Sequence, residues 1–549
     1  MSQTTPRAVE RHLGGESGHR SFFGGTHSRS RVAFVALFVV GGMIGTPLIG
    51  WPAIAVAVVG VGVTLLVTTR THRGTIASRA RARRRWRSRV AAGTDAFVPY
   101  EVAAWDQLTQ AAKTVKGRRA QWEARRAVAG MRATPDGADG LGWLQFGRGE
   151  PGIAWHAPVG EQDYLSVAFT VTGQLRGIES ASVMTRAAEG WGAFLAARAV
   201  PSSLVADVQT MTRVLPSDTA LQEFWVLGAL DKNAPAEAVQ SYEEVLRRTG
   251  AGAMVQRHYV VVKWPLTAPF LDAARKYGAG RDGWRGLMRE ELAAAYRGLS
   301  DSRTGTVEVL SARQLTAVLL HQQNPSRPID YVADVHPSKL GVRSYDEFSA
   351  HVVDGVDPVT GERTEWWHRT AKIEAAALAT APRTQLWMLE LLVGRDLAFI
   401  RSVSFHIHLV PAAEAKAAAQ RDLVRDQAEA MSKSEHGQID LDETGMHMSA
   451  SRRRRVDLRA GSGHHGAAWV GYVTISVRSR EELSRASRQL EETCATGLGI
   501  EYLDWQDSYQ AAASGTTWPI GRGLTANDQS FSARVYRTLA GKSEKEAIS

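Results

Sequence analysis

Two histidines, His406 and His408, stand two residues apart in a segment whose alternating pattern predicts a strand. Side chains at positions i and i+2 of a strand share one face, and paired imidazoles are common ligands of zinc and related metals. A third ligand would have to come from elsewhere, for example His464 or His465, and nothing in the spacing selects one. We therefore favour a half-buried or edge strand face over a metal site at this pair.

Two glycine-containing motifs resemble nucleotide-binding signatures. Gly278-Ala279-Gly280-Arg281-Asp282-Gly283 has the spacing of a dinucleotide fingerprint, but the helical segment Phe270–Tyr277 separates it from the preceding strand. We interpret these glycines as a turn between two helices. Gly541-Lys542-Ser543 has the ending of a phosphate-binding loop, but Tyr536 occupies the position of its first glycine. Neither motif predicts a cofactor.

The composition narrows the classes of function. The chain has 549 residues, a formal net charge of +10 and one cysteine, Cys494. One cysteine excludes an intramolecular disulfide and a multi-cysteine metal site, and it agrees with a reducing compartment. Cys494 itself is predicted to be a small helix residue, not a nucleophile. We find no metalloprotease, hydrolase-elbow or catalytic-triad pattern, so we expect a scaffold, not an enzyme, with no cofactor.

An uncharged segment near the amino terminus predicts a membrane hairpin. No charged residue occurs from Val32 to Thr69, which is about twice the length that one helix needs to cross a bilayer. Its two apolar arms are Val32–Ile49 and Ala53–Val67, and two proline turns are predicted near its middle, at Thr46-Pro47 and Gly50-Trp51-Pro52. Proline and glycine favour a turn there, and tryptophan suits a membrane interface. A signal peptide fits poorly, because the apolar segment is too long and begins too late.

Arginines on both sides of the hairpin predict its orientation. Positive charge at both ends places both termini in the cytoplasm, so we expect a multi-pass protein of the plasma membrane. We predict that the cluster after the hairpin lies on anionic lipid headgroups, with nucleic-acid binding as the alternative. Its members are Arg79, Arg81, Arg83, Arg84, Arg85, Arg87 and Arg89.

The chain beyond the hairpin alternates between strand and helix patterns, which predicts an α+β fold. The expected parts are a disordered tail (1–30), the transmembrane hairpin (31–70), a basic juxtamembrane helical region (71–135), two α+β domains (136–300 and 301–530) and a flexible tail (531–549). Residues 324–364 are rich in Pro, Asp and Gly, and we expect an irregular connection there.

The clearest strands alternate apolar and polar residues. Tyr164–Thr172 has the pattern of a half-buried antiparallel strand. Ala468–Val477 precedes Ser479 and Glu482, which fit a capping box, and Ile500–Trp505 follows as a strand. This strand–helix–strand unit fits either a ferredoxin-like layer or a doubly wound sheet. Further strands are predicted at Leu204–Val214, Val255–Trp264 and Phe399–Val410, and helices at Ala104–Arg132, Ala181–Ala199, Gly283–Leu299 and Ala412–Ser432.

Several segments together resemble a family of actinobacterial conjugative-transfer (type IV secretion) membrane proteins, which occur with PrgI-family partners and a transfer ATPase. The segments are the hairpin Val32–Val67, the arginine cluster, His258–Pro265, Gly471–Ser476, Leu498–Ile500 and Trp518–Leu524. The last is similar to the end of the amino-terminal, non-ATPase half of the conjugation ATPase. The resemblance implies a membrane-tethered copy of that docking half without its motor, and it supplies no catalytic residues.

Three functions remain open on the sequence. The first is a non-catalytic scaffold of a type IV secretion apparatus for DNA transfer that docks a separate ATPase. The second is a type VII secretion membrane component of the EccE kind. The third is a membrane-tethered, metal-dependent enzyme that uses His406 and His408. The expected partners are membrane lipids, the secretion ATPase and other channel subunits, while self-association and direct DNA contact are left open.

Overall fold

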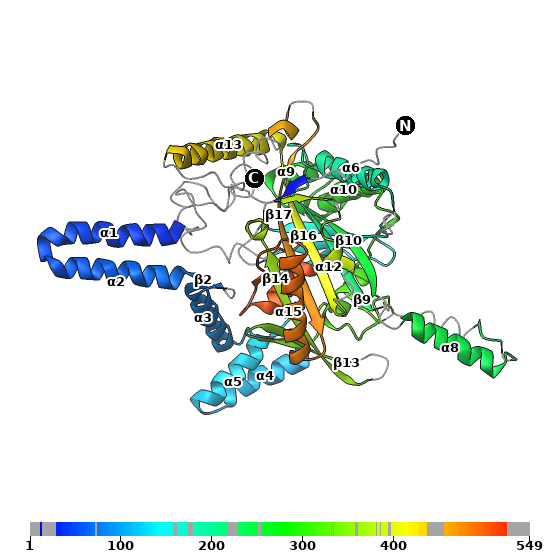
Figure 1. The fold of residues 1–549 in the computed structure, drawn as a ribbon. Coiled ribbons are helices and arrows are strands. Elements are labelled where there is room, and N and C mark those ends of the chain that lie inside the picture. The colour runs from blue at the N-terminus through cyan, green and yellow to red at the C-terminus, as the bar shows by residue number, and fades with distance from the viewer. Residues whose placement is uncertain are drawn as a thin grey trace, which may run out of the picture.

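The structure is a computed structural model in which a helical hairpin projects from an α+β body built on one large sheet (Figure 1). It describes residues 11–13, 29–71, 74–158, 162–173, 179–216, 229–231, 233–250, 254–330, 332, 334–356, 361–379, 381–384, 386–393, 397–435, 455–459 and 462–523. The mixed α+β class predicted from the sequence is confirmed.

The central sheet has 14 strands, in the order β5-β4-β12-β13-β14-β17-β16-β9-β10-β8-β7-β6, with β11 added on β8 and β18 on β14. The strands are β4 (Ala96–Pro99), β5 (Met131–Arg132), β6 (Leu141–Gln145), β7 (Ile153–His156), β8 (Tyr164–Val171), β9 (Asp207–Pro216), β10 (Met254–Pro265), β11 (Val307–Val309), β12 (Ser344–Glu347), β13 (Ala350–Val356), β14 (Arg363–Ile373), β16 (Ile400–Val410), β17 (Gly466–Val477) and β18 (Asp504–Trp505).

The sheet contains the same arrangement of strands twice. In each half a β-hairpin, β6–β7 or β12–β13, precedes four strands that lie in the order β11-β8-β10-β9 or β18-β14-β17-β16. Numbered along the chain, both orders are 4-1-3-2, and all neighbours are antiparallel. This is the strand order of the ferredoxin-like, split βαβ arrangement. The doubly wound alternative does not fit, because its neighbouring strands would be mostly parallel.

The two repeats meet edge to edge through their second strands. β9 and β16 pair antiparallel, with Met211 opposite Ser404 and Thr212 opposite Val403. An antiparallel pair of equivalent strands relates the repeats by an approximate two-fold axis through the sheet. The predicted domain boundary at residue 300 therefore falls inside the first repeat, which β11 completes.

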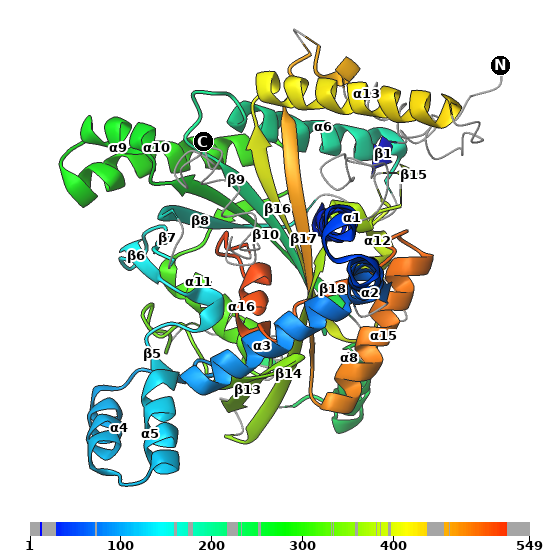
Figure 2. The same ribbon diagram turned by 90° about the vertical axis from the view of Figure 1, so that its left-hand side faces the viewer.

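Helices cover one face of both repeats (Figure 2). In the first repeat Phe169 and Trp264 of the sheet pack with Met288 and Leu299 of helix α10. In the second repeat Ile475 packs with Leu490 of helix α15. The helices of this face are α6 (Ala181–Arg198), α9 (Ala268–Arg275), α10 (Gly280–Asp301), α12 (Leu389–Val393) and α15 (Arg480–Thr496).

Shorter elements and the segment up to residue 523 cover the other face. Trp518 and Ile520 pack on Tyr259 and Val261 of β10. Layers on both faces explain why the first six residues of β8 are all buried, so the half-buried strand predicted there is wrong. The elements of this layer are α11 (Ala312–Gln323), α16 (Gln510–Ser514) and the 3-10 helix η4 (Gly515–Thr517).

Three other predictions are corrected by the structure. The irregular connection expected at residues 324–364 contains β12 and β13, which form the hairpin of the second repeat. The single helix expected at Ala104–Arg132 is a pair, α4 (Val102–Thr114) and α5 (Arg118–Gly130). Ile500–Trp505 forms strand only at its end, as β18, although Ile500 makes an isolated bridge to Leu378.

Several helices lie outside the layers of the sheet in Figure 1. The helices α1 (Arg29–Ile49) and α2 (Trp51–Thr68) lie side by side at one end, and α8 (Ala236–Gly250) projects at the opposite end. α13 (Ala412–Glu435) lies along the top of the body. The remaining short strands form two pairs, β1 (Arg11–Leu13) with β15 (Ala381–Arg383) and β2 (Arg70–Thr71) with β3 (Gly74–Thr75).

Small residues allow α1 and α2 to lie close together. A Cβ atom at Gly42 would come within 2.6 Å of the Ala57 Cβ, and one at Gly45 within 3.0 Å of the Ala53 Cβ. Such glycines let helix backbones approach closely in apolar surroundings. The turn is at Gly50, where φ is 75°, and Pro52 lies in the first turn of α2. The turn predicted at Thr46-Pro47 is wrong, because α1 continues through Pro47 to Ile49. Within the described residues, α2 is the one helix long and apolar enough to span a membrane.

Candidate membrane interface

The helix α3 (Ile76–Ala92) connects the hairpin to the sheet and carries the predicted arginine cluster. It begins where the Thr75 hydroxyl accepts a hydrogen bond from the Ser78 N–H, at 3.0 Å. It ends at Gly93, whose φ is 72°. Glycine suits this position for two reasons. Its φ is positive, and an added Cβ would lie 2.7 Å from the Arg126 Cα in α5.

Six members of the cluster are exposed on α3, and they are Arg79, Arg81, Arg83, Arg84, Arg85 and Arg87. Their positions suit the predicted contact with lipid headgroups. Arg89 differs, because its side chain is buried. It makes ion pairs with Asp136 and Asp346, so we remove Arg89 from the predicted lipid-facing set.

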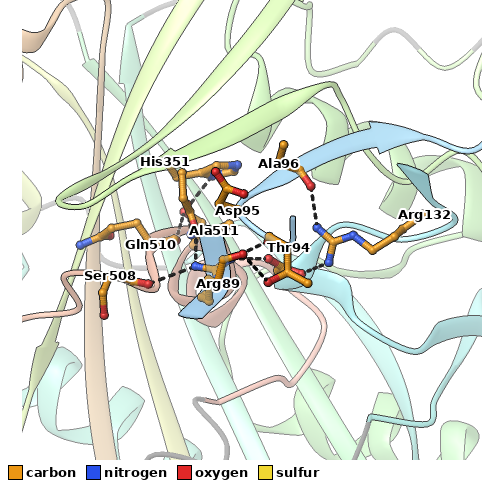
Figure 3. Close-up of polar contacts among 12 residues, drawn as sticks. Arg89, Thr94, Asp95, Ala96, Arg132, His351, Ser508, Gln510 and Ala511 are labelled. Carbon is orange, nitrogen blue, oxygen red and sulfur yellow. Dashed lines mark hydrogen bonds and ion pairs between the residues drawn. The ribbon is translucent and has the colours of Figure 1, made fainter. Parts of the chain in front are cut away.

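The Arg89 guanidinium is the centre of a buried polar joint between α3 and the body (Figure 3). Its Nη1 donates to the Asp346 Oδ2 on β12 and, at 3.1 Å, to the Ser508 carbonyl. Its Nη2 donates to the Thr94 carbonyl at 2.9 Å and to the Asp136 Oδ2 at 2.8 Å. One side chain thus fastens α3 to three separate segments of the chain.

The acidic partners of Arg89 are themselves held in place. The other oxygen of Asp346, Oδ1, accepts the backbone N–H of Ala511 at 2.8 Å, and Asp136 also pairs with Arg132. Burial lowers the pKa of Arg89, but the two carboxylates outweigh burial and leave it raised. Burial also raises the pKa of Asp346 to about 7, although Arg89 opposes that shift. Charges removed from water in this way are tolerated because they are paired and hydrogen-bonded.

Aromatic contacts surround the joint. Trp86 of α3 meets Phe348 edge to face, with ring centroids 6.4 Å apart. The Tyr509 ring lies 5.2 Å from the Arg89 guanidinium carbon and 5.9 Å from that of Arg85. Trp86 and Arg89 are three residues apart and therefore lie on the same side of the helix, the side that contacts the body.

The candidate metal pair is not supported by its surroundings. His406 is half-buried and its Nε2 lies 2.8 Å from the Thr516 carbonyl oxygen, while desolvation lowers its pKa to about 4. The His408 Nδ1 lies 2.8 Å from the Asp207 Oδ1, and this hydrogen bond raises the pKa of His408. His465 receives the backbone N–H of Ala412 on its Nδ1. Among the described residues, no group of three His, Cys, Asp or Glu side chains is placed to hold a metal.

The other motifs have structural roles where the structure describes them. Gly278–Gly283 forms the turn from α9 into α10, as predicted, with φ of 148° at Gly278 and 55° at Gly280. Cys494 is buried in α15, and burial raises its pKa to about 12, which disfavours the thiolate form that a nucleophile requires. Gly541-Lys542-Ser543 lies outside the described residues.

The carboxylates of the joint were not found from the sequence. Asp346 lies in the segment expected to be irregular, and Asp136 lies at the expected boundary between the basic helical region (71–135) and the first α+β domain. The sequence feature that indicates a buried side of α3 is the spacing of Trp86 and Arg89, which share a helix face within an otherwise polar segment. Comparison with known proteins adds no identification, since no family model and no curated protein matches this chain.

Proposed function

We propose that this chain is a membrane-anchored, non-catalytic scaffold of a type IV secretion apparatus for conjugative DNA transfer, on which a separate ATPase docks. The observation that carries the anchored part is the buried joint of Arg89 with Asp136 and Asp346. A rigid joint lets an anchor hold the body in one orientation, whereas a flexible tether would leave it free to turn.

In this proposal both α1 and α2 cross the bilayer, which makes the protein multi-pass with both ends in the cytoplasm. The close approach at Gly42 and Gly45, the turn at Gly50 and the exposed apolar side chains of both helices support a hairpin in lipid. The apolar part of α1, Ala33–Ile49, is short for a span, so the bilayer is thinned around it.

The transfer apparatus is proposed from the sequence resemblance. Two of its segments, His258–Pro265 and Gly471–Ser476, belong to β10 and β17, which are equivalent strands of the two repeats. Both resembling segments lie on the third strand of a repeat. This supports the proposal that the body has the same fold as the docking half of the conjugation ATPase. The wide, regular sheet with both faces covered is suited to presenting loops and helices to partner subunits.

The proposal is tested by deletion and by purification from native membranes. Loss of the gene abolishes conjugative transfer, and the tagged full-length protein recovers a conjugation-type ATPase while turning over no ATP itself. Recovery of an FtsK-like ATPase instead supports the type VII alternative. ATP turnover that follows the purified chain through further purification contradicts the scaffold role.

A further inference from the structure

A second basic surface lies at the turn between α4 and α5, which we name the basic tip (residues 113–119). It contains Lys113, Lys116, Arg118 and Arg119, all exposed, and no acidic residue. The nearest acidic partner is Glu123, which pairs with Arg119 at 3.1 Å on the surface of α5. This exposed pair is weak, and it offsets at most one of the four positive charges.

The basic tip is held on a rigid base. At the root of the helix pair, Arg126 of α5 pairs with Asp95, and the Gly93 backbone packs directly against Arg126. At the tip itself, the Gln121 Nε2 donates to the Val115 carbonyl at 3.2 Å and closes the turn. The four cations therefore keep a defined position relative to α3, which is joined to the body only a few residues before Gly93.

The position of the basic tip relative to the hairpin is informative. In Figure 1 the pair α4–α5 extends from the body on the side from which α1 and α2 leave, whereas α8 projects on the opposite side. Figure 2, viewed from the hairpin side, shows α3 crossing the body and α4–α5 extending beyond its end. The exposed arginines of α3 and the basic tip thus lie on the same side of the sheet.

We propose that the basic tip rests on anionic lipid headgroups and forms, with α3, a second contact that sets the orientation of the body on the membrane. This inference depends on the proposed anchoring by the hairpin. Each basic residue close to an anionic surface contributes about 1 kcal/mol, or about fivefold in the equilibrium constant for contact. Lipid is favoured over nucleic acid because the tip lies on the side where the proposed membrane would be.

The test uses the full chain in nanodiscs of phosphatidylcholine alone or of an equimolar mixture with phosphatidylglycerol. An environment-sensitive fluorophore is attached at Thr114→Cys, while the native Cys494 is buried and escapes labelling. Headgroup spin-labelled lipid then reports contact by quenching. We expect several-fold stronger quenching in the anionic discs, lost at high salt because exposed charges are screened.

Two variants separate the tip from charge in general. R118Q/R119Q should lower the equilibrium constant for contact with anionic lipid by more than tenfold and weaken the quenching accordingly. The quadruple Gln variant at Lys113, Lys116, Arg118 and Arg119 should reduce the quenching to the value in neutral discs. Arg248→Glu on α8 changes the net charge as much as the double variant and leaves the quenching unchanged. A probe at Ser241→Cys on α8 stays unquenched in both discs.

The outcomes distinguish the inference from the proposed function. A protein that elutes with the discs but shows equal quenching in neutral and anionic lipid overturns the tip contact and leaves the anchor intact. A protein that separates from the discs overturns the anchoring, and the tip contact with it. A larger fluorescence change with duplex DNA on neutral discs than with anionic lipid assigns the tip to nucleic acid and overturns the lipid contact.

Discussion

The Arg89 guanidinium meets the Asp346 carboxylate where the connecting helix α3 crosses the second repeat, and neither side chain reaches bulk solvent freely. The same guanidinium reaches Asp136, which precedes the first repeat in the chain. One cation therefore links the hairpin to elements before and within the duplicated sheet. Folding of the body therefore fixes the orientation of the hairpin relative to the sheet.

Replacement of Arg89 by Ala should be strongly destabilising, because it leaves Asp346 buried without its cation. We expect a loss of about 3–5 kcal/mol in the free energy of unfolding, the usual cost of removing one partner of a buried ion pair. Denaturant unfolding of the full chain in detergent measures it. Arg87→Ala, on the exposed side of the same helix, should change stability by less than about 0.5 kcal/mol. Equal effects of the two variants would contradict the joint.

Replacement of Gly93 by Ala should also weaken the attachment of α3. The new Cβ would lie 2.7 Å from the Arg126 Cα, and φ is 72°, so strain and a clash with α5 add together. We expect a cost above the roughly 1–3 kcal/mol of left-handed backbone alone. Gly117→Ala is the matched control, because φ is 103° there but nothing lies within 4 Å of the added Cβ. A larger cost at Gly117 than at Gly93 would show that the close approach does not hold.

The stability should fall in mild acid because at least five histidines are held in neutral form, of which His156, His321, His351 and His368 are buried and His406 is half-buried. Asp346 and His408, whose pKa values are raised, act in the opposite sense and reduce the net slope. Burial lowers the pKa of His321, His351 and His368 to about 3 and that of His406 to about 4. The unfolded chain binds protons near pH 6.5, so stability is present above that pH and is lost as pH falls towards the folded values.

Each of these histidines contributes a slope of up to about 1.4 kcal/mol per pH unit in that window. Denaturant midpoints measured between about pH 7 and pH 5 test the slope. His406→Gln keeps a donor to the Thr516 carbonyl and removes one titrating group, so it should flatten the curve. A slope unchanged in that variant would mean that His406 is not held in neutral form.

Local patterns predicted most of the elements but not how they combine. Tyr164–Val171 and Ala468–Val477 were found from alternation, and the cap at Ser479 from its residue types. The cap is confirmed in part, since the Ser479 hydroxyl accepts the Glu482 N–H at 3.2 Å while the Glu482 carboxylate accepts the N–H of Arg478. These features depend on neighbours in the chain, which a sequence displays directly.

The duplication and the joint depend on residues far apart in the chain. Met211 and Ser404 become neighbours only when two sheets share an edge, and no local pattern marks that edge. The buried face between the sheet and η4 contains polar side chains, with Gln209 donating to the carbonyls of Thr516 and Trp518. A strand with polar side chains on one of its buried faces has the alternation of a half-buried strand. It does not have the continuous apolar run by which strands buried on both sides are recognised. Arg89, within a run of arginines, has the same residue type as its exposed neighbours.

The edge shared by β9 and β16 should make the two repeats unfold together. Val208 of β9 is fully buried and belongs to the same apolar cluster as Leu409 of β16. The core of the first repeat therefore includes a side chain from the second repeat. Val208→Ala should cost about 1–3 kcal/mol by removal of buried methyl groups. Hydrogen exchange should then show the same loss of protection in β17 as in β10, although β17 does not contact the mutated strand in the ladder. Val245→Ala on the exposed α8 should leave both strands unchanged. If β10 loses protection while β17 keeps it, the repeats are separate folding units, and the pairing of β9 with β16 is only a contact between them.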